Sequence, residues 1–171
     1  MKVIFILAPR GYQDLEYAVP KKILEEAGIE VVIASKSGGT CVGKLGGMIK
    51  ESLALADIKM DQYAAIVFIG GPGAVSYQHD SEAHHLAQEA VSQHKWLAAI
   101  CIAPTILAYS GVLKGKKATV WNGDGRQEEL LQTCGVKYTG EKVTVEGKIV
   151  TANGPDAAEE FGRTLVKLMK R

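Results

Sequence analysis

The sequence has no marked excess of either charge, and this excludes one class of partner. Its 171 residues include Lys+Arg 20 and Asp+Glu 19, for a net charge of +1. Nucleic-acid-binding domains usually carry a strongly basic surface, so we expect no nucleic-acid partner. An apolar content of 47% and a charged content of 23% are ordinary for a globular chain. With this length they predict one domain over residues 1–171.

Cysteine is also scarce. Three cysteines, an odd number, do not form a disulfide framework. The apolar run VIFILA near the N-terminus is too short for a signal peptide, and no cleavage site precedes Pro9 and Arg10. We therefore expect reduced thiols and a cytoplasmic protein.

Long uncharged segments are few, and one needs examination as a membrane span. Residues 96–113 contain no charged residue over 18 positions, the lower limit for a spanning helix. Pro104, Ser110 and Gly111 interrupt the segment, and its first half has the pattern of a strand. We expect it to lie in the core of a soluble protein and predict no membrane partner.

Histidine is confined to one region, which leaves few candidates for a metal site. All four histidines lie in or near one expected surface helix; they are His79, His84, His85 and His94. His84 and His94 are too far apart along a helix to share a metal. A solvated helix face is the better interpretation, and we predict no metal.

Two glycine-rich segments resemble nucleotide-binding motifs only in part. Residues 38–44 (GGTCVGK) have Walker A spacing up to the lysine, but Leu45 stands where Ser or Thr is required. Residues 71–76 (GPGAVS) lack the third glycine of a dinucleotide fingerprint. We therefore expect no nucleotide, and no cofactor of any kind.

Apolar runs and amphipathic segments alternate along the chain. The runs predict buried strands at 2–8, 30–34, 64–69 and 96–100. The amphipathic segments predict helices at 15–27, 81–94, 102–109 and 155–170. Shorter elements are expected as a hairpin within 37–50, a strand at 117–121, a helix at 126–133, and a hairpin of 143–146 with 148–151. The pattern predicts an α/β three-layer sandwich with a central, mostly parallel, flavodoxin-like sheet, which binds ligands at the carboxyl ends of its strands.

Cys101 lies between the expected strand 96–100 and the helix 102–109. This sharp junction matches the nucleophile elbow of serine hydrolases, with sulfur in place of oxygen. Amides at a helix start favour a thiolate, so we expect Cys101 to titrate well below the free-thiol value of about 8.5. The alternative is a cysteine that acts only as a small buried apolar residue.

Two carboxylates lie at the start of the first helix, also at the carboxyl end of the sheet. Pro20 cannot donate a hydrogen bond to the carbonyl of Glu16, so a local irregularity falls beside that carboxylate. Irregularities of this kind occur at functional sites. Alternatively, Asp14 caps the helix and Glu16 only complements its dipole.

The loop of residues 70–73 (GGPG) follows the third strand. Amides of Gly70 and Gly71, together with that of Ile102, could form an oxyanion hole, because glycine lets backbone approach a substrate closely. An ordinary glycine turn is the alternative.

Four stretches together resemble the ThiJ/PfpI (DJ-one) family of the class I glutamine amidotransferase-like superfamily. They are ILAPRGYQDLEYAVPKKILEEAGIEV, the IGGPG loop, AAICIAPTILAYSGVLKGKKAT and VEGKIVTANGP, and they span essentially the whole chain. The resemblance implies a flavodoxin-like sandwich, Cys101 as the reactive residue, and a protonated Glu16 that hydrogen-bonds its sulfur. It assigns the oxyanion amides to Gly71 and Ile102. It also implies a homodimer or larger homo-oligomer, with the segment around Glu16 and the segment 38–47 at the subunit contact and Lys44 near the partner's site.

The sequence departs from the peptidase-like members of that family. Those members carry histidine directly after the cysteine, where this chain has Ile102. Their acid from a neighbouring subunit would fall near Ala74 or Val75, and the histidine of other members falls at Trp121. Without an imidazole, amide cleavage lacks its usual proton shuttle.

Three functions follow from these observations. The first is a cysteine-dependent enzyme of the glyoxalase or deglycase kind, in which Cys101 attacks a small reactive carbonyl and Glu16 moves the proton. Trp121, Asp14 and Lys44 are further candidates for the lining of its site. The second is a redox-sensing or chaperone-like stress protein in which Cys101 is oxidised to sulfinate. The third is an amidase or peptidase.

Overall fold

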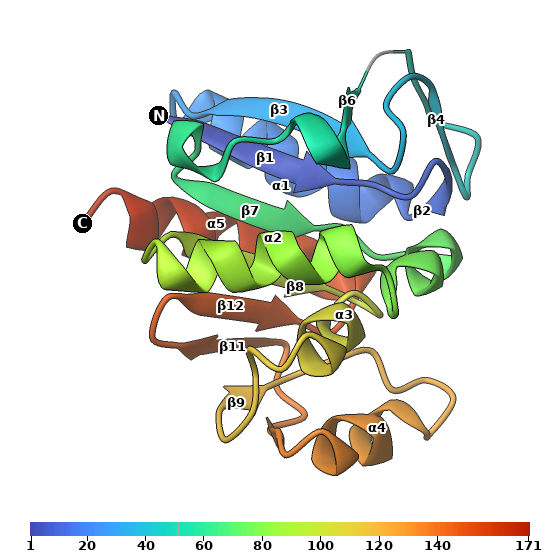
Figure 1. The fold of residues 1–171 in the computed structure, drawn as a ribbon, viewed down its shortest axis with the longest axis vertical. Helices are drawn as coiled ribbons and strands as arrows, with labels where there is room; N and C mark the ends of the chain where they lie inside the picture. The colour runs from blue at the N-terminus through green and yellow to red at the C-terminus, as the bar shows by residue number, and fades with distance from the viewer. Residues whose placement is uncertain (51) are drawn as a thin grey trace.

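A seven-stranded sheet forms the centre of the molecule in the computed structural model, which describes residues 1–50 and 52–171 (Figure 1). Its strands, in spatial order, are β11 (Val143–Glu146), β12 (Ile149–Ala152), β8 (Trp96–Ile100), β7 (Ala65–Phe68), β1 (Lys2–Ile6), β3 (Glu30–Ser35) and β6 (Leu53–Ala54). All neighbours pair in parallel except β11 and β12. The order β3-β1-β7-β8-β12 is that of flavodoxin, so the predicted fold class is confirmed.

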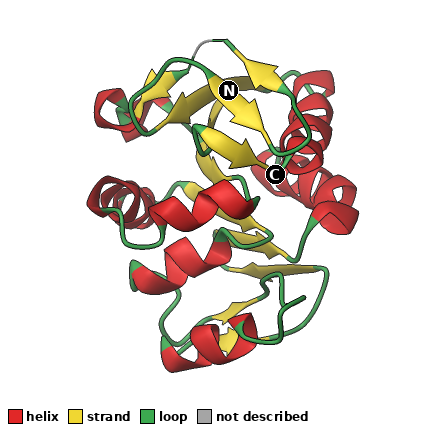
Figure 2. Cartoon of the chain, turned by 90° about the vertical axis from the view of Figure 1, so that its right-hand side faces the viewer, coloured by secondary structure: helices red, strands yellow, loops and turns green. Residues whose placement is uncertain are grey.

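Helices cover both faces of the sheet, as Figure 2 shows. Side chains alternate between the faces: Ile4 and Ile6 join one buried cluster, while Val3 and Phe5 join the other. The first cluster is completed by α2 (Ser81–Ser92), α3 (Pro104–Tyr109) and α4 (Gln127–Thr133), and the second by α1 (Asp14–Glu26) and α5 (Ala158–Met169). Burial of both faces explains why the central strands are continuous apolar runs.

Close packing of α1 against α5 places the start of α1 firmly over the sheet. A Cβ added to Gly162 of α5 would lie 3.0 Å from Cα of Pro20, so only glycine allows this approach without displacement. The side chain of Gln13 caps α1 by accepting from the amide of Leu15 at 3.0 Å. The alternative that Asp14 caps this helix is therefore wrong.

Two small sheets flank the central one. The expected hairpin within 37–50 is present as β4 (Cys41–Gly43) and β5 (Met48–Ile49), which join β2 (Arg10–Tyr12). The expected strand at 117–121 is shorter: β9 covers Lys117–Ala118 and pairs with β10 (Lys137–Tyr138). It ends early because the next amide, that of Thr119, donates to the side chain of Thr151 at 2.9 Å.

Four short 3₁₀ helices complete the described elements: η1 (Leu55–Asp57), η2 (Met60–Gln62), η3 (Pro72–Tyr77) and η4 (Pro155–Ala157). The uncharged segment 96–113 forms β8, a turn and α3, which is the core location expected for it. Across residues 1–50 and 52–171, none of the helices combines the length and the apolar character needed to cross a membrane.

Candidate active site

Cys101 occupies a strained turn directly after β8. Its φ of 64° lies in the left-handed region, which residues with a side chain rarely adopt. Its amide donates to the carbonyl of Ala152 at 2.9 Å, and its carbonyl accepts from the amide of Trp121 at 2.8 Å. Hydrogen bonds to two other segments thus hold the strained residue, and the predicted nucleophile elbow is confirmed.

The helix after Cys101 begins later than predicted. Residues 101–103 form a turn, and α3 starts at Pro104, whose fixed φ suits the first helical position. Thr105 supports this turn: its hydroxyl donates to the carbonyl of Ile102 at 2.6 Å and accepts from the side-chain nitrogen Nε2 of Gln78 at 2.9 Å. The turn is thereby connected to the end of η3 as well as to α3.

Glu16 projects from the first turn of α1 into the protein beside Cys101. The residue is fully buried, and neither of its carboxyl oxygens makes a full hydrogen bond within the protein. The space for it exists because residue 70 is glycine: a Cβ there would lie 2.5 Å from both Cys101 Cβ and Glu16 Oε2. A buried, unsatisfied carboxyl group is costly, which is typical of a functional rather than a structural residue.

Three backbone amides near Cys101, two from the glycine loop and one from the residue after the cysteine, contact two different groups. Those of Gly71 and Ile102 interact with the sulfur of Cys101, whereas that of Gly70 interacts with the carboxyl group of Glu16. Gly71 has a φ of 102°, and the carbonyl of Gly70 accepts from the amide of Gln13 at 2.9 Å. The loop therefore needs glycine for its backbone conformation and is held against the start of α1.

Burial dominates the titration of both reactive groups. Desolvation raises the pKa of Glu16 to about 7, although Cys101, the Gly70 amide and Lys44 lower it in part. Burial first, and then the Glu16 charge, raise the pKa of Cys101 to about 12, despite the amides of Gly71 and Ile102. The expectation of a lowered thiol pKa is thus wrong. Near neutral pH Glu16 is only partly protonated, whereas the family resemblance implied a protonated one.

The raised pKa of Glu16 predicts that stability falls as pH rises. The folded protein holds this proton more tightly than the unfolded chain does, so the stabilisation is complete below about pH 4.5 and is lost as pH rises through about 7. The shift corresponds to about 3 kcal/mol of unfolding free energy. Urea unfolding near pH 4 and near pH 8 should show this loss in the wild type and not in Glu16→Gln.

The matched control for that measurement is Glu26→Gln, at an exposed position of the same helix. It should keep the wild-type pH dependence. An equal loss of stability with pH in Glu16→Gln would show that Glu16 is not the group responsible.

Asp14 anchors the loop that joins β4 and β5. Its carboxylate accepts from the amide of Leu45 at 2.7 Å and from that of Gly47 at 2.8 Å. A Cβ on Gly43 or Gly47 would collide with this carboxylate, which accounts for glycine at both positions. Asp14 thereby positions Lys44 at the cavity of its own chain, where Lys44 lowers the pKa of Glu16.

Asp14→Asn should loosen this loop. The substitution keeps the shape but removes the charge that strengthens the two amide hydrogen bonds. We expect tryptic cleavage after Lys44 to become faster on the order of tenfold, because the weakening of a charge-assisted hydrogen bond makes opening of the loop more frequent by about that factor. Asp57→Asn, at an exposed position outside the loop, is the control. Unchanged cleavage in Asp14→Asn would contradict the anchoring role.

A cavity of about 500 Å³ opens over Cys101 and Glu16. Four of the predicted residues line it: Gly71, Ile102, Trp121 and Lys44. Gly70 and Asp14 are not among the lining residues; Gly70 leaves space for Glu16, and Asp14 holds the loop that carries Lys44. The cavity also has polar lining residues that the sequence analysis missed: Gln13, Gln78, Asp124, Arg126 and Gln127. No sequence motif marks them, because separate segments bring them together.

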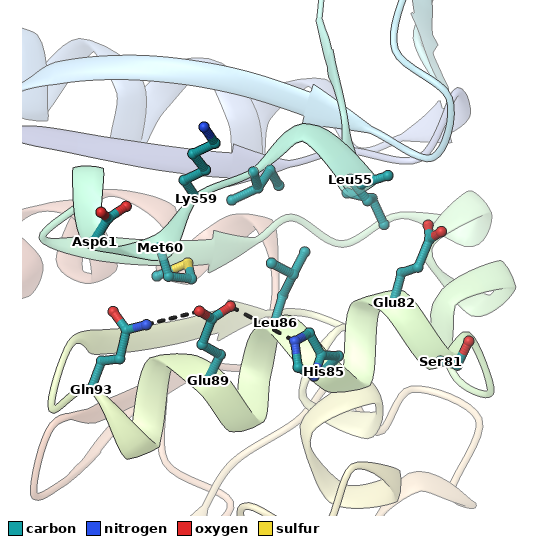
Figure 3. Close-up of a pocket in the computed structure, with 12 residues that line it drawn as sticks. Leu55, Lys59, Met60, Asp61, Ser81, Glu82, His85, Leu86, Glu89 and Gln93 are labelled. Carbon is teal, nitrogen blue, oxygen red and sulfur yellow. Dashed lines mark hydrogen bonds and ion pairs between the residues drawn. The ribbon is translucent and has the colours of Figure 1, made fainter.

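A larger surface groove, of about 640 Å³, lies between α2 and the η1–η2 segment (Figure 3). Glu89 accepts from Gln93 at 2.8 Å and lies 4.0 Å from His85 there. This arrangement fits the expected solvated helix face, and no cysteine lines the groove. The smaller cavity is the better candidate site because it contains the strained cysteine and the buried carboxyl group.

Neither a metal site nor an imidazole accompanies Cys101. Among residues 1–50 and 52–171, no group of three His, Cys, Asp or Glu side chains is arranged to hold a metal ion. His84 contacts the carbonyl of Gln78 at 2.7 Å, and His79 packs on Tyr109 with ring centres 4.4 Å apart. None of the residues that line the Cys101 cavity is a histidine. Glu16 is the ionisable side chain whose pKa is coupled to that of Cys101.

The chain as a whole resembles known proteins in sequence and in fold. A sequence model described as the DJ-1/PfpI family matches residues 1–168. The chain belongs to this family. The same fold recurs in a ThiJ/PfpI domain protein from Brachyspira murdochii, with a TM-score of 0.94 and 30% identity over 99% of this chain and 96% of that one.

Two relatives with different names share nearly the full length of this DJ-1/PfpI-family chain. A deglycase from Pyrococcus horikoshii is 33% identical over 170 residues, which are 99% of this chain and 100% of that protein. A provisionally named cysteine protease from Bacillus subtilis is 32% identical over 170 residues, 99% of both. The names of these relatives indicate enzymatic activity in the family and differ on the reaction.

Proposed function

We propose that this protein is a cysteine-dependent enzyme that acts on small reactive carbonyl compounds, as a glyoxalase or deglycase does. The observation that carries the proposal is the pairing of Cys101, in a strained elbow, with the buried carboxyl group of Glu16. A carboxyl group with a pKa of about 7 suits proton transfer near neutral pH. The deglycase name of the Pyrococcus horikoshii relative agrees with this reaction class.

In the proposed step the sulfur of Cys101 adds to an aldehyde carbon. The carbon–sulfur bond forms as the carbon–oxygen double bond becomes single, and the thiol proton passes to ionised Glu16. Amides of Gly71 and Ile102 stabilise the developing oxyanion, and Glu16 then returns the proton to that oxygen. The adduct is a neutral hemithioacetal. A shift of hydrogen from its carbon to the neighbouring carbonyl carbon converts it to the thioester of lactate, and water then breaks the carbon–sulfur bond to release lactate and the thiol. Methylglyoxal and water together have the composition of lactate, so the reaction needs no oxidant.

This arrangement favours carbonyl addition over amide cleavage. Cleavage of an amide requires protonation of the leaving nitrogen, usually by an imidazole, and none of the residues that line the cavity is a histidine. The acid that peptidase-like members supply from a neighbouring subunit is also missing, because its position falls near Ala74, which is buried, or Val75, which is exposed, and neither side chain is a carboxylate. We expect methylglyoxal to be consumed with formation of lactate, and peptide substrates to remain intact. Robust proteolysis by the pure protein would overturn the proposal.

We also propose a homodimer or larger homo-oligomer. Three large apolar side chains near the start of α1 and the β4–β5 loop are strongly exposed: Leu15, Leu45 and Met48. Burial of such side chains drives association. Light scattering at micromolar concentration should give at least twice the chain mass of 18.3 kDa, and Leu45→Lys should lower it. A monomer at that concentration would contradict the proposal.

A further inference from the structure

Most polar side chains that line the cavity over Cys101 are already bound to other groups of the protein. Gln78 Nε2 donates to the hydroxyl group of Thr105 at 2.9 Å, and Gln13 Oε1 accepts from the amide of Leu15 at 3.0 Å. A ligand that used either atom would have to share or replace an existing hydrogen bond, so the net gain in binding would be small.

Three further polar lining residues pair with one another. Asp124 Oδ2 accepts from Gln127 Nε2 at 2.9 Å and from the guanidinium group of Arg126 at 3.2 Å. The remaining polar side chains of the lining are the reactive pair and Lys44, whose charge acts on Glu16. The part of a substrate away from the reacting carbonyl group therefore has few unpaired polar partners in this cavity.

The apolar part of the lining includes surface that is open to solvent. Six apolar residues contribute to it: Pro72, Val75, Ile102, Trp121, Leu130 and Pro155. Val75 and Trp121 are 48% and 37% exposed, so a ligand in the cavity can reach both side chains. Covering such surface with an apolar group removes it from water, which favours binding.

Trp121 is held next to the reactive cysteine. Its amide donates to the carbonyl of Cys101 at 2.8 Å, so the two backbones are in direct contact. Its ring lies against the backbone of Gly123, where an added Cβ would be 2.5 Å from the ring atom Cζ2. Glycine at position 123 thus leaves the place that the ring occupies. A flat aromatic side chain is thereby fixed in the wall of the cavity that contains the sulfur.

We infer that Trp121 is a specificity-determining residue that, together with Val75, binds an aromatic substituent of the substrate. This inference rests on the proposed function and narrows it: the preferred substrates are 2-oxoaldehydes with an aromatic group, such as phenylglyoxal. An aromatic ring gains more from contact with an indole ring than its apolar area alone provides. Phenylglyoxal would react as methylglyoxal does, with a shift of hydrogen between its two carbonyl carbons and addition of water, and the product would be mandelate.

The first test compares phenylglyoxal with methylglyoxal on each protein, by the yields of mandelate and lactate. The ratio of kcat/KM for the two compounds should fall about tenfold in Trp121→Ala, the effect of one aromatic contact. Val75→Ala should lower the ratio less, and Trp121→Phe should keep most of it because a ring remains. The ratio cancels any general loss of reactivity at Cys101. A wild-type ratio in Trp121→Ala would contradict the inference.

Two residues outside the cavity provide matched controls. Tyr109 is an aromatic residue with the same 37% exposure as Trp121, and Val145, at 44%, matches Val75. Neither control residue lines the cavity over Cys101. Tyr109→Ala and Val145→Ala should therefore keep the wild-type ratio.

A second measurement separates this inference from the proposed function. Alkylation of Cys101 needs no turnover, and iodoacetanilide differs from iodoacetamide by a phenyl group on its nitrogen. Relative to a free thiol, Cys101 of the wild type should favour iodoacetanilide by about tenfold, and that of Trp121→Ala should not. If neither 2-oxoaldehyde is consumed but this difference is seen, the proposed function fails and the aromatic subsite at Trp121 stands. An equal ratio of the two alkylation rates in wild type and Trp121→Ala would overturn the inference.

Discussion

Cys101→Ser should abolish the consumption of methylglyoxal, with a fall in kcat/KM on the order of 10⁴-fold or more, as loss of a nucleophile produces in other enzymes. Serine fits the elbow, so the backbone bonds to Ala152 and Trp121 should persist. A hydroxyl group, however, is a far weaker acid than a thiol, and a carboxylate with a pKa of about 7 cannot activate it. The measurement is the loss of methylglyoxal together with the yield of lactate.

The other two cysteines provide matched controls. Cys41 is buried with its sulfur 3.7 Å from the hydroxyl oxygen of Ser52, and Cys134 is half-buried. Neither is among the residues that line the cavity over Cys101. The double variant Cys41→Ser/Cys134→Ser should therefore keep wild-type activity. Activity in Cys101→Ser within tenfold of wild type would eliminate Cys101 as the nucleophile.

Glu16→Gln should lower turnover by about 10²–10⁴-fold, the usual contribution of a general acid–base group. In the wild type, kcat/KM should rise with pH through about 7, because Glu16 must be ionised to take the thiol proton. Glutamine has similar size but cannot accept that proton, so the rise should disappear. The pH dependence of kcat/KM for both proteins measures this.

The same substitution should have the opposite effect on alkylation of Cys101. The charge of Glu16 is one cause of the raised pKa of Cys101, so removing it should lower that pKa. Labelling by iodoacetamide near pH 8 should then be faster in Glu16→Gln, although turnover is slower. Parallel losses of labelling and turnover would instead indicate a collapsed site, and the proton-transfer role of Glu16 would have no support.

Much of the fold could be predicted because it depends on periodicity. The apolar runs 30–34 and 96–100 match β3 and β8 within one residue, and the order of strands follows from repeated strand–helix alternation. Cys101 and Glu16 could be proposed from local signals, since one follows a strand directly and the other lies four residues before a proline inside a helix. Boundaries depend on hydrogen bonds between segments, so the end of β9 and the start of α3 were misplaced.

The remainder of the site depends on contacts that a linear pattern does not display. The partners of Asp14 are amides more than thirty residues away, which is why it looked like a helix cap. The raised pKa of Cys101 comes from burial, which outweighs the two amides that a strand–helix junction suggests. Gln127 lies on the same short helix as three other glutamines or glutamates of similar size, and only the three-dimensional contact with Asp124 distinguishes it.

Detection of the proposed hemithioacetal tests the account most directly. The Cys41→Ser/Cys134→Ser variant, which keeps Cys101 alone, would be mixed with methylglyoxal labelled with ¹³C at its aldehyde carbon and observed by NMR. We predict a protein-bound tetrahedral carbon resonance that is absent from a variant carrying Cys101→Ser in addition to these two substitutions. If no such adduct forms and methylglyoxal is not consumed, while mild peroxide converts Cys101 selectively to sulfinate, the carbonyl chemistry is contradicted and a redox-sensing role takes its place.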